Sequence, residues 1–387
     1  MNYKDKIAVI GNGGEWSGYP VVRELGKRGY KVYAFLQKKN SPLCHSKYLR
    51  GGKYQIPKKI NAQMLKIIIY FCRIKNIKKI ICLDEDIKLF IIQNLNLFKD
   101  INYAFPSEKS MEIAISKSKS TEFAKNLGIP VPKTLRFTSK EEVKKVEHDF
   151  NHPLVIKGEG GVSSSHIRYA HNREQLQKYF DEIYILEKSI SSSSPLPHIQ
   201  EYIGGPTYLS QAIVQNGKTK VVIPHYKFRE WPLSGGVSSR AKTIAEPKLV
   251  KYMTKMLNAL KWHGEAGMEW KYDVERDDFF FMEMNPRFEG SVDLAIKSGV
   301  NLPIILVDII DEIPVPDKIH YNCPVHYRWF YGHDFKCFLH GSYGISTLFR
   351  ETLNSNIAGE VGINDLSVLR HYWKKPILEL VNFMKNK

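Results

Sequence analysis

The sequence predicts an α/β part followed by α+β parts within one chain of 387 residues. Residues Lys6–Leu36 read as a strand, a helix and a second strand, which is the usual opening of a parallel sheet. Residues Met268–Arg287 instead read as two strands joined by a polar turn, which is an antiparallel hairpin. The length allows two or three domains with cores of their own, so we expect more than one domain.

The chain carries an excess of positive charge. Fifty-seven lysine and arginine residues oppose 40 aspartate and glutamate residues, which gives a net charge of +17. Such an excess suits an anionic partner, such as a nucleotide, a polyanionic substrate, nucleic acid or a membrane surface. The lysines are spread along the chain and form no long basic block, however, so general lysine richness explains the charge more simply. We therefore expect no nucleic-acid partner.

Cysteine usage and the N-terminal residues favour the cytoplasm. The five cysteines form no C-x-x-C pair, and their odd number argues against a disulfide framework or structural zinc. The N-terminal apolar run is too short for a signal peptide. Because no apolar run reaches the ~20 residues that a spanning helix needs, we expect no transmembrane segment.

The first turn of the chain is rich in glycine. Gly11, Gly13 and Gly14 follow the predicted strand Lys6–Ile10, and such a turn can receive a phosphate at the next helix N-terminus. The run does not complete the G-x-G-x-x-G dinucleotide pattern, because Trp16 stands at the position of the last glycine. A tight turn that only starts the sheet explains these residues equally well.

An acidic cluster follows a second predicted strand. Ala62–Lys75 is predicted to be a helix and Lys78–Leu83 a buried strand, which ends at Asp84–Asp86. Carboxylates at the C-terminal edge of a parallel strand lie where such sheets bind ligands. They can also cap the next helix, and both interpretations stay open here.

A lysine followed by a glycine- and serine-rich run marks a candidate phosphate loop. A helical segment is predicted over residues 107–128, ended by Gly128, before an extended IPVP segment. Asn151–Lys157 then reads as a strand, and residues 158–165 form the glycine- and serine-rich run. Its N–H groups and hydroxyls could surround phosphate oxygens while the lysine neutralises charge. A flexible hairpin tip is the alternative.

The remaining segments continue the α+β pattern. Ser191–Pro197 is a predicted break. The predicted strands that follow it are His198–Ile203, Tyr208–Val214 and Lys220–Pro224. The predicted helices are Lys248–Leu260, Gly290–Ile296 and a helix within Leu366–Lys387. The last could lie at a membrane interface, but Pro376 breaks the pattern, so a helix packed on its own domain or on a partner subunit is the simpler interpretation. Lys227–Arg240 is polar and glycine-rich, so we predict a loop in which Arg229 and Arg240 could hold an anion.

The hairpin carries the most specific signal. Folded about Arg276, it places Glu269 opposite Glu283, where Cβ atoms lie only ~5 Å apart and like charges repel. Asn285 and Arg287 share the face of Glu283, because side chains alternate along a strand. Mg²⁺ binds one or two carboxylates together with substrate phosphates, so the pattern predicts a magnesium site. Arg287 would then donate to a phosphate or carboxylate. A solvated hairpin with scattered charges is the alternative.

Four features, in this order, resemble the ATP-grasp superfamily, which includes carbamoyl phosphate synthetase, biotin carboxylase and D-alanine–D-alanine ligase. They are Lys117, Lys157 with its glycine loop, Gln200–Ile203, and Glu269 followed by Glu283–Arg287 (EMNPR). The resemblance covers roughly residues 1 to 310. Within it, FREWPLSGGVSS and MNPRFEGSVDLAIKSGVNLP look most like the carboxylate–amine ligase branch.

The resemblance implies an ATP-grasp fold in four parts. These are an N-terminal Rossmann-like pre-ATP-grasp α/β domain (1–107), a small lid (108–203), a C-terminal α+β catalytic part (204–330) and a C-terminal extension (331–387). ATP would lie between the lid and the catalytic part.

By match of motif, the resemblance also implies three groups of site residues. Those that would bind ATP are Lys117, Lys157, Gly160, Gly161, Ser163, Ser164, Glu201, Tyr202, Ile203 and Thr207. Those that would bind two Mg²⁺ ions, with Mn²⁺ as an alternative ion, are Glu269, Glu283 and Asn285. The residues taken as catalytic are Lys157 and Arg287 by this match, and Arg240 because it lies in the predicted anion-holding loop.

Two positions depart from the family's pattern. The family usually has a glutamate for the ribose hydroxyls just after the adenine strand, and here that place falls near Thr207. The phosphate loop of the family often reads G-S-x-G-V, whereas His166 stands here at its second glycine. We therefore expect the ribose contact and the loop geometry to differ from those of the family.

Together these features predict an ATP-dependent ligase that joins a carboxylate to an amine through an acyl phosphate and releases ADP and phosphate. Phosphoryl transfer turns a carboxylate oxygen into a leaving group, while Mg²⁺ and basic side chains disperse the negative charge. The carboxylate would be a small molecule or linked to a polymer, and a homodimer is left open. The alternatives are a phosphotransferase acting on a non-carboxylate acceptor and a non-catalytic nucleotide-binding module.

Overall fold

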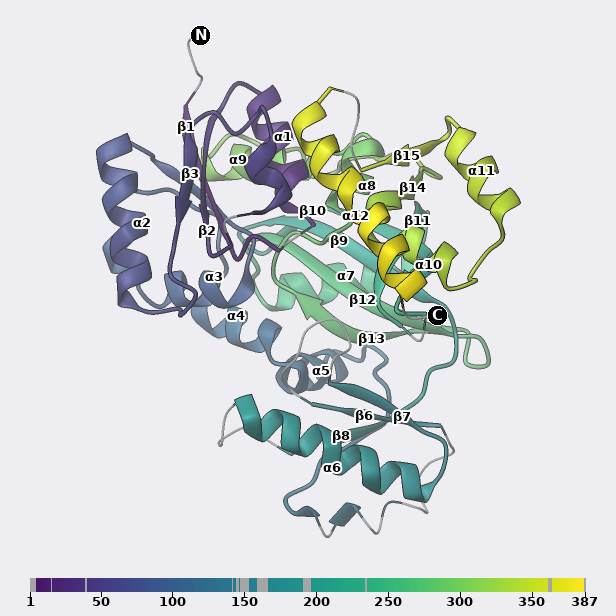
Figure 1. Cartoon of the computed structure of the whole chain (residues 1–387). Coiled ribbons are helices and arrows are strands. Elements are labelled where there is room, and N and C mark those ends of the chain that lie inside the picture. The colour runs from purple at the N-terminus through teal and green to yellow at the C-terminus, as the bar shows by residue number, and fades with distance from the viewer. Residues whose placement is uncertain are drawn as a thin grey trace.

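The computed structural model describes residues 5–14, 16–38, 40–140, 142, 143, 146, 153–158, 166–190, 196–233, 235–360 and 364–385. The strands described there form three sheets. In Figure 1 the N-terminal sheet and the largest sheet lie together in the upper part of the molecule, and the smallest sheet lies below them. Parallel and antiparallel sheets therefore occur in one chain, which confirms the predicted mixture of α/β and α+β structure.

The N-terminal sheet is parallel and has the strand order β3-β2-β1-β4. Its strands are β1 (Lys6–Gly11), β2 (Lys31–Leu36), β3 (Gly52–Gln55) and β4 (Lys79–Cys82). Its helices are α1 (Gly18–Lys27), α2 (Ala62–Lys75) and α3 (Glu85–Ile92). Side chains of β1 alternate between two cores: Ala8 and Ile10 share one with α2, and Ile7 and Val9 share the other with α1. This burial on both faces is typical of a parallel sheet and confirms the predicted βαβ opening.

The smallest sheet has the order β5-β8-β6-β7 and is called the lid sheet below. Its strands are β5 (Thr134–Leu135), β6 (Leu154–Lys157), β7 (Ile167–Ala170) and β8 (His198–Glu201). Helix α6 (Arg173–Ile190) covers one face, where Phe180 packs in one cluster with Ile156 and Ile199. The alternate residues of β6 and β8 point away from this helix, toward the largest sheet.

The largest sheet has seven strands in the order β13-β12-β9-β10-β11-β14-β15. They are β9 (Thr207–Gln215), β10 (Lys218–Trp231), β11 (Val237–Thr243), β12 (Gly264–Asp273), β13 (Asp278–Asn285), β14 (His326–Arg328) and β15 (Ile357–Gly359). Helix α7 (Pro247–Ala259) packs against one face with Trp270, and α8 (Val292–Lys297) and α9 (Leu302–Ile310) follow the hairpin. The hairpin β12–β13 pairs Glu269 with Glu283, so the predicted register is confirmed.

The helical segment predicted over residues 107–128 is helical in the structure and is divided into two helices at Ser116. Helix α4 runs from Glu108 to Ile115 and α5 from Lys117 to Asn126. Between them Ser116 has an extended backbone, and its hydroxyl accepts a hydrogen bond from the Lys119 N–H at 3.3 Å. A serine that caps a helix in this way starts a new one, and Lys117 becomes its first residue.

The loop predicted over Lys227–Arg240 is wrong. Strand β10 continues to Trp231, well beyond the predicted Lys220–Pro224, and β11 pairs with it from Val237 onward. The charged side chains that suggested a loop have partners from distant parts of the chain. Lys227 pairs with Glu269, and Arg229 with Asp334 at 2.9 Å. Paired in this way, they can be buried within a sheet.

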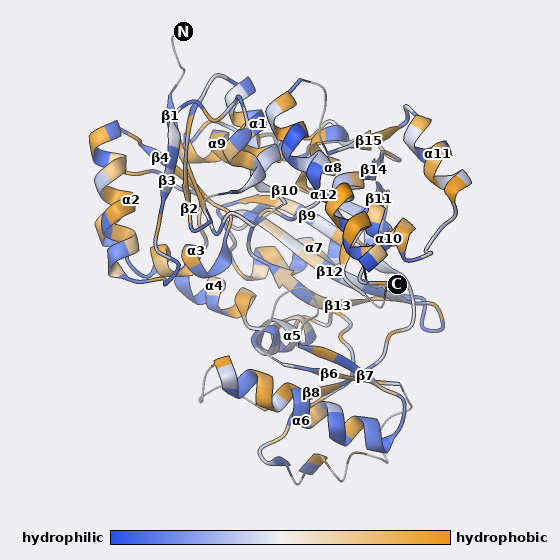
Figure 2. Cartoon of the chain, viewed as in Figure 1, coloured by the Kyte–Doolittle hydropathy of each residue, from blue (hydrophilic) through white to orange (hydrophobic). Residues whose placement is uncertain are grey.

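The C-terminal residues form η4 (Phe330–Asp334), α10 (Phe335–Leu339), α11 (Ile345–Leu353) and α12 (Leu366–Lys385). Helix α12 lies within the range where a helix is predicted, and it continues through Pro376. Pro376 is buried together with Val368 and Tyr372, and this packing offsets the hydrogen bond lost at the proline. Figure 2 shows that α11 and α12 also present apolar segments on the outside of the molecule.

A buried ion pair ties the N-terminal sheet to the largest sheet. Lys88 of α3 contacts the carboxylate of Glu265 on β12, and both side chains are at most 2% exposed. Lys88 also donates a hydrogen bond to the carbonyl oxygen of Pro286 at 2.6 Å. The lysine therefore fixes the segment that follows β13, which includes Arg287.

Among the described helices, none combines the length and the apolar character that crossing a membrane would require. The domain boundaries expected from the sequence remain predictions.

Candidate active site

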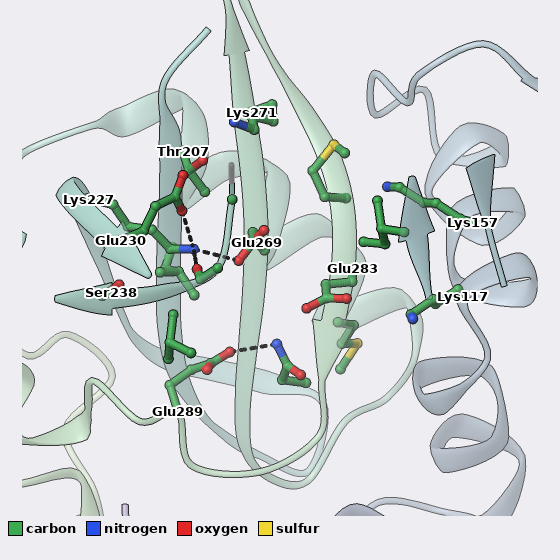
Figure 3. Close-up of a pocket in the computed structure, with 18 of the residues that line it drawn as sticks. Lys117, Lys157, Thr207, Lys227, Glu230, Ser238, Glu269, Lys271, Glu283 and Glu289 are labelled. Carbon is green, nitrogen blue, oxygen red and sulfur yellow. Dashed lines mark hydrogen bonds and ion pairs between the residues drawn. The ribbon is translucent and has the colours of Figure 1, made fainter. Parts of the chain in front are cut away.

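A cavity of about 290 Å³ lies between the lid sheet and the largest sheet. Residues of the lid sheet and of α5 line one side, and residues of β9 to β13 line the other. Figure 3 shows Lys117 and Lys157 entering from the lid side, facing Glu269 and Glu283 of the hairpin. The cavity thus brings together residues that lie more than 100 positions apart in the sequence.

The hairpin supplies the acidic wall. Met268 and Trp270 point into the core beneath α7. Because side chains alternate along a strand, Glu269 and Lys271 point the other way, into the cavity. Glu283 and Asn285 enter from the neighbouring strand β13. All three predicted metal ligands, Glu269, Glu283 and Asn285, therefore line one cavity.

Lys227 of β10 neutralises part of this wall. Its Nζ lies 2.9 Å from Glu269 Oε2 and 3.5 Å from Glu230 Oε2, and it donates to the Gly236 carbonyl at 2.9 Å. Burial lowers the pKa of Lys227, but the two carboxylates outweigh burial and raise it above its ordinary value. Lys227 therefore stays charged at neutral pH and occupies one oxygen of Glu269.

The opposite wall is cationic. Lys117 is the first residue of α5, so its ammonium adds to the positive end of that helix dipole. Lys157 ends β6, and burial lowers its pKa to about 8, with Lys117 acting in the same direction against Glu283 and Glu269. Two lysines placed this close at a helix N-terminus make a site for phosphate oxygens.

Polar atoms of β8 face the cavity without partners. His198 Nδ1 and Gln200 Oε1 are buried, and neither has a hydrogen-bond partner within the part of the chain that the structure describes. Burial and the nearby lysines lower the pKa of His198 to about 3, so its ring is neutral. A bound molecule with donors and acceptors of its own would satisfy both atoms.

The predicted adenine segment also lines the cavity, together with Thr207. Glu201, Tyr202 and Ile203 are all present in the wall. The Glu201 N–H donates to the Lys133 carbonyl at 2.9 Å, which joins β8 to the segment before β5. The Glu201 carboxylate accepts from Arg276 at 3.2 Å, which links the lid sheet to the hairpin turn.

Arg287 lies between two carboxylates. Its guanidinium is 3.4 Å from Glu85 Oε2 and 3.8 Å from Glu289 Oε2, and it donates to Asn285 Oδ1 at 3.3 Å. Asn285 in turn donates to Glu289 Oε1 at 2.9 Å, as the dashed line in Figure 3 shows. Burial raises the pKa of Glu85 and of Glu289, the latter to about 7.

The structure does not bring Arg240 to the cavity. Together with Arg229 it contacts Glu351 of α11, and Arg229 and Arg328 contact the buried Asp334. These residues form a cluster of charges behind the cavity, and a catalytic role for Arg240 stays a prediction from the sequence. Gly160, Gly161, Ser163 and Ser164 lie outside the described residues.

The N-terminal features that left two interpretations open are now placed. Asp84 caps α3 by accepting from the Ile87 N–H at 3.0 Å, and it also accepts from Asn12 Nδ2 at 2.8 Å. Its role in the structure is therefore that of a helix cap that joins the glycine turn. Glu85 and Trp16, its neighbours on these two segments, do line the cavity.

Several cavity residues were missed by reasoning from the sequence. They are Trp16, His198, Lys227, Glu230, Lys271, Glu289, Trp329 and His333, whereas Glu85 and Gln200 belong to segments that the sequence had singled out. Strand alternation could have found Lys271, because it lies two positions beyond Glu269. Lys227 was hidden by the wrong loop prediction, and Trp329 and His333 lie in segments with no motif.

A metal ion would need ligands from a bound molecule. No cluster of three or more His, Cys, Asp or Glu side chains suited to a metal occurs within the described ranges. Glu269, Glu283 and Asn285 nevertheless offer oxygen atoms on one wall, opposite the lysines. Mg²⁺ commonly binds to one or two carboxylates plus substrate phosphates, so these residues fit Mg²⁺ bound together with a nucleotide.

Comparison with known proteins now identifies the domain. Residues 199–332 match the family described as ATP-grasp in the biosynthetic pathway with Ter operon. Over these residues the chain resembles an ATP-grasp domain. The matched residues include β9 to β13 with Glu269, Glu283, Asn285 and Arg287, which form one wall of the cavity.

Relatives of this chain include the carbamoyl phosphate synthase large chain of Clostridium acetobutylicum. The two sequences are 26% identical over 215 residues, which cover 53% of this chain and 19% of that protein. A solved structure of N5-carboxyaminoimidazole synthetase from Staphylococcus aureus is similar with a TM-score of 0.67 and 15% identity, covering 89% of this chain and 86% of that one. The biotin carboxylase domain of 2-oxoglutarate carboxylase from Hydrogenobacter thermophilus, a dimer with MgADP and bicarbonate, has a TM-score of 0.65 and 17% identity and covers 83% and 72%.

These likenesses establish the ATP-grasp fold. The chain spans less than half the length of the curated relatives that it matches first, from about a fifth of the synthase to 43% of plant biotin carboxylases. What each relative does is therefore a property of that relative.

Proposed function

We propose that this chain is an ATP-dependent ligase that joins a carboxylate to an amine through an acyl phosphate. One observation carries the proposal: Lys117 and Lys157 face Glu269 and Glu283 across a single cavity. Cations suited to phosphates thus lie opposite oxygen ligands suited to Mg²⁺, which is the arrangement needed to hold a nucleoside triphosphate by its tail.

The nucleotide would lie along β8, with its base at Glu201–Ile203 and its phosphates at the lysines. Gln200 Oε1 and His198 Nδ1, which have no hydrogen-bond partner among the described residues, would form hydrogen bonds with the nucleotide. Glu230 lines the cavity together with Thr207, so its carboxylate is a candidate for the ribose hydroxyls that the family's usual glutamate would bind. Lys117 and Lys157 would hold the phosphate oxygens by charge-assisted hydrogen bonds.

The reaction would proceed beside Arg287. Glu269, Glu283 and Asn285 would hold two Mg²⁺ ions, which when bound neutralise charge that builds up on the transferring phosphoryl group. Arg287 would donate to the γ-phosphate and then to the acyl phosphate. Attack of the amine on the acyl carbon forms the C–N bond, and the phosphate leaves with the electron pair of its C–O bond. No nucleophilic side chain of the protein is needed.

The test is a screen of carboxylate and amine pairs for ADP release, with products identified by mass spectrometry. Release should depend on the carboxylate and yield ADP and phosphate. Hydroxylamine, offered in place of the amine, should trap the acyl phosphate as a hydroxamate. AMP and pyrophosphate would indicate an adenylate mechanism and refute the proposal, and a stable phosphorylated alcohol would favour a phosphotransferase.

We also propose a cellular compartment and an oligomeric state for the enzyme. The five cysteines are unbridged, which suits the reducing cytoplasm. A homodimer is proposed by analogy with the dimeric carboxylase domain described above and is testable by light scattering.

A further inference from the structure

One end of the cavity is aromatic. Trp16, Trp329 and His333 line it there, and the rings of Trp16 and His333 lie 5.3 Å apart between centroids. Trp16 packs directly on the backbone of Gly290, where a Cβ atom would come within 3.2 Å of Trp16 Cβ. Glu289 precedes Gly290, so it lies next to this aromatic end. In Figure 3 Glu289 lies far from Thr207 and Lys271, which line the opposite end of the cavity.

Among the described residues that line this end, two are carboxylates and one is a charged base. Glu85 and Glu289 both line it, and the guanidinium of Arg287 lies between them, 3.4 Å and 3.8 Å away. One cation therefore serves two carboxylates. Both carboxylates are largely shielded from solvent, with 28% and 9% of their side-chain surfaces exposed, so the excess charge is weakly screened.

The arginines expected to bind a second anion do not contribute here. Arg229 and Arg240 are both in contact with Glu351, and neither lines the cavity. The described residues that line this end offer a ligand two carboxylates and parts of two indole rings, and Lys375 Nζ already lies 4.4 Å from the ring of Trp16. Carboxylates attract cations, and indole rings cover apolar surface.

We infer that this end of the cavity binds the amine substrate as an ammonium ion attached to an apolar or aromatic body. The ammonium group lies beside Glu85 and Glu289, and the body lies against Trp16 and Trp329. This assignment rests on the proposed ligase function and names the class of its amine.

Arg287 couples the amine site to the nucleotide. In the structure its guanidinium is shared by Glu85 and Glu289, and in the proposed reaction it donates to the γ-phosphate. A nucleotide that attracts Arg287 toward its phosphates leaves the two carboxylates without their cation. The ammonium ion then takes that place, so the amine binds more tightly after the nucleotide than before it.

The experiment is calorimetry with three probes that share one body and differ in charge: phenethylamine, phenethyl alcohol and 3-phenylpropionate. The full chain is first loaded with Mg²⁺ and a non-hydrolysable ATP analogue. Phenethylamine should bind at least tenfold more tightly than the alcohol, and the carboxylate should bind most weakly. Without the analogue, the affinity for phenethylamine should fall at least fivefold.

Matched variants locate the ammonium. Glu85→Gln should weaken phenethylamine binding at least fivefold and leave binding of the alcohol unchanged. Asp86→Asn is the control, because Asp86 follows in the same helical turn, is exposed and does not line the cavity. Trp16→Phe should keep part of the affinity for both probes, and Trp16→Leu should lose more of it, provided that circular dichroism shows a native spectrum.

The outcomes separate this inference from the proposed function. If the analogue binds but the alcohol or the carboxylate binds as tightly as the amine, or no probe binds at all, the inference is overturned while the nucleotide site stands. An equal effect of Glu85→Gln and Asp86→Asn also overturns it. If the ATP analogue itself does not bind in the presence of Mg²⁺, the proposed function fails.

Discussion

Replacing Lys88 by methionine should destabilise the protein more than any surface substitution. Lys88 and Glu265 are at most 2% exposed, and the second oxygen of Glu265, Oε2, has no hydrogen-bond partner among the residues described. Methionine fills a similar volume but leaves the carboxylate buried and without its counter-charge. The hydrogen bond from Lys88 to the Pro286 carbonyl is lost as well.

The expected loss is about 3–5 kcal/mol, the usual cost of removing one partner from a buried ion pair. With a urea m-value of ~2–3 kcal/mol per molar, the unfolding midpoint should fall by ~1–2 M. The loss should also grow with pH. Burial raises the pKa of Glu265, so the folded variant binds a proton that the unfolded chain releases, and its stability falls as pH rises from about 4.5 toward that raised pKa.

Urea unfolding followed by tryptophan fluorescence and circular dichroism measures this loss. The double variant Lys88→Met with Glu265→Leu is the matched control, because it removes both charges and should recover most of the stability. If the single variant loses less than ~1 kcal/mol, or the double variant is no more stable than the single one, the ion pair does not hold the two sheets together as argued.

Three further predictions concern the site and its surroundings. Glu283→Gln and Asn285→Ala should each abolish ADP release without changing the circular dichroism spectrum, and EDTA should do the same to the wild type until Mg²⁺ is restored; near-normal turnover at saturating Mg²⁺ would contradict the metal assignment. Because the pKa of Lys157 is about 8 and phosphate binding requires its charged form, affinity for the ATP analogue should fall about tenfold between pH 7 and pH 9. Lys157→Arg should remove that fall, and an unchanged pH profile would place the titrating group elsewhere. Glu351→Gln should cost about 3 kcal/mol of stability, because two arginines lose a shared buried partner, yet leave affinity for the analogue unchanged; a weaker affinity with unchanged stability would return Arg240 to the site.

Local rules were enough to predict the hairpin and its acidic pair. The polar turn centred near Arg276 and the alternation of side chains determined that Glu269 would face Glu283, and the structure confirms this pairing. The strand Lys31–Leu36 and the helix Ala62–Lys75 were also predicted with the bounds observed. In each case the information lies within about 20 consecutive residues.

The parts that could not be predicted depend on contacts between distant segments. Arg229 and Lys227 suggested a loop because each is charged, and only Asp334 and Glu269, far away in the sequence, allow them to lie in a buried strand. The aromatic end of the cavity is assembled in the same way, from Trp16 and from residues more than 300 positions later. No pattern within a single segment predicts such a contact between distant residues.

Trp16 has a second neighbour whose position matters during synthesis. Its indole ring stacks on Tyr372 of α12 with 6.0 Å between centroids, and Lys375 Nζ lies 4.4 Å from the ring. Domains made first on the ribosome generally fold first, so the N-terminal sheet and strands β8 to β13 of the cavity can form before α12 exists. Until α12 has been made, Trp16 lacks the support of Tyr372. A nascent chain would therefore form the lysine and carboxylate walls of the cavity before its aromatic end is in place.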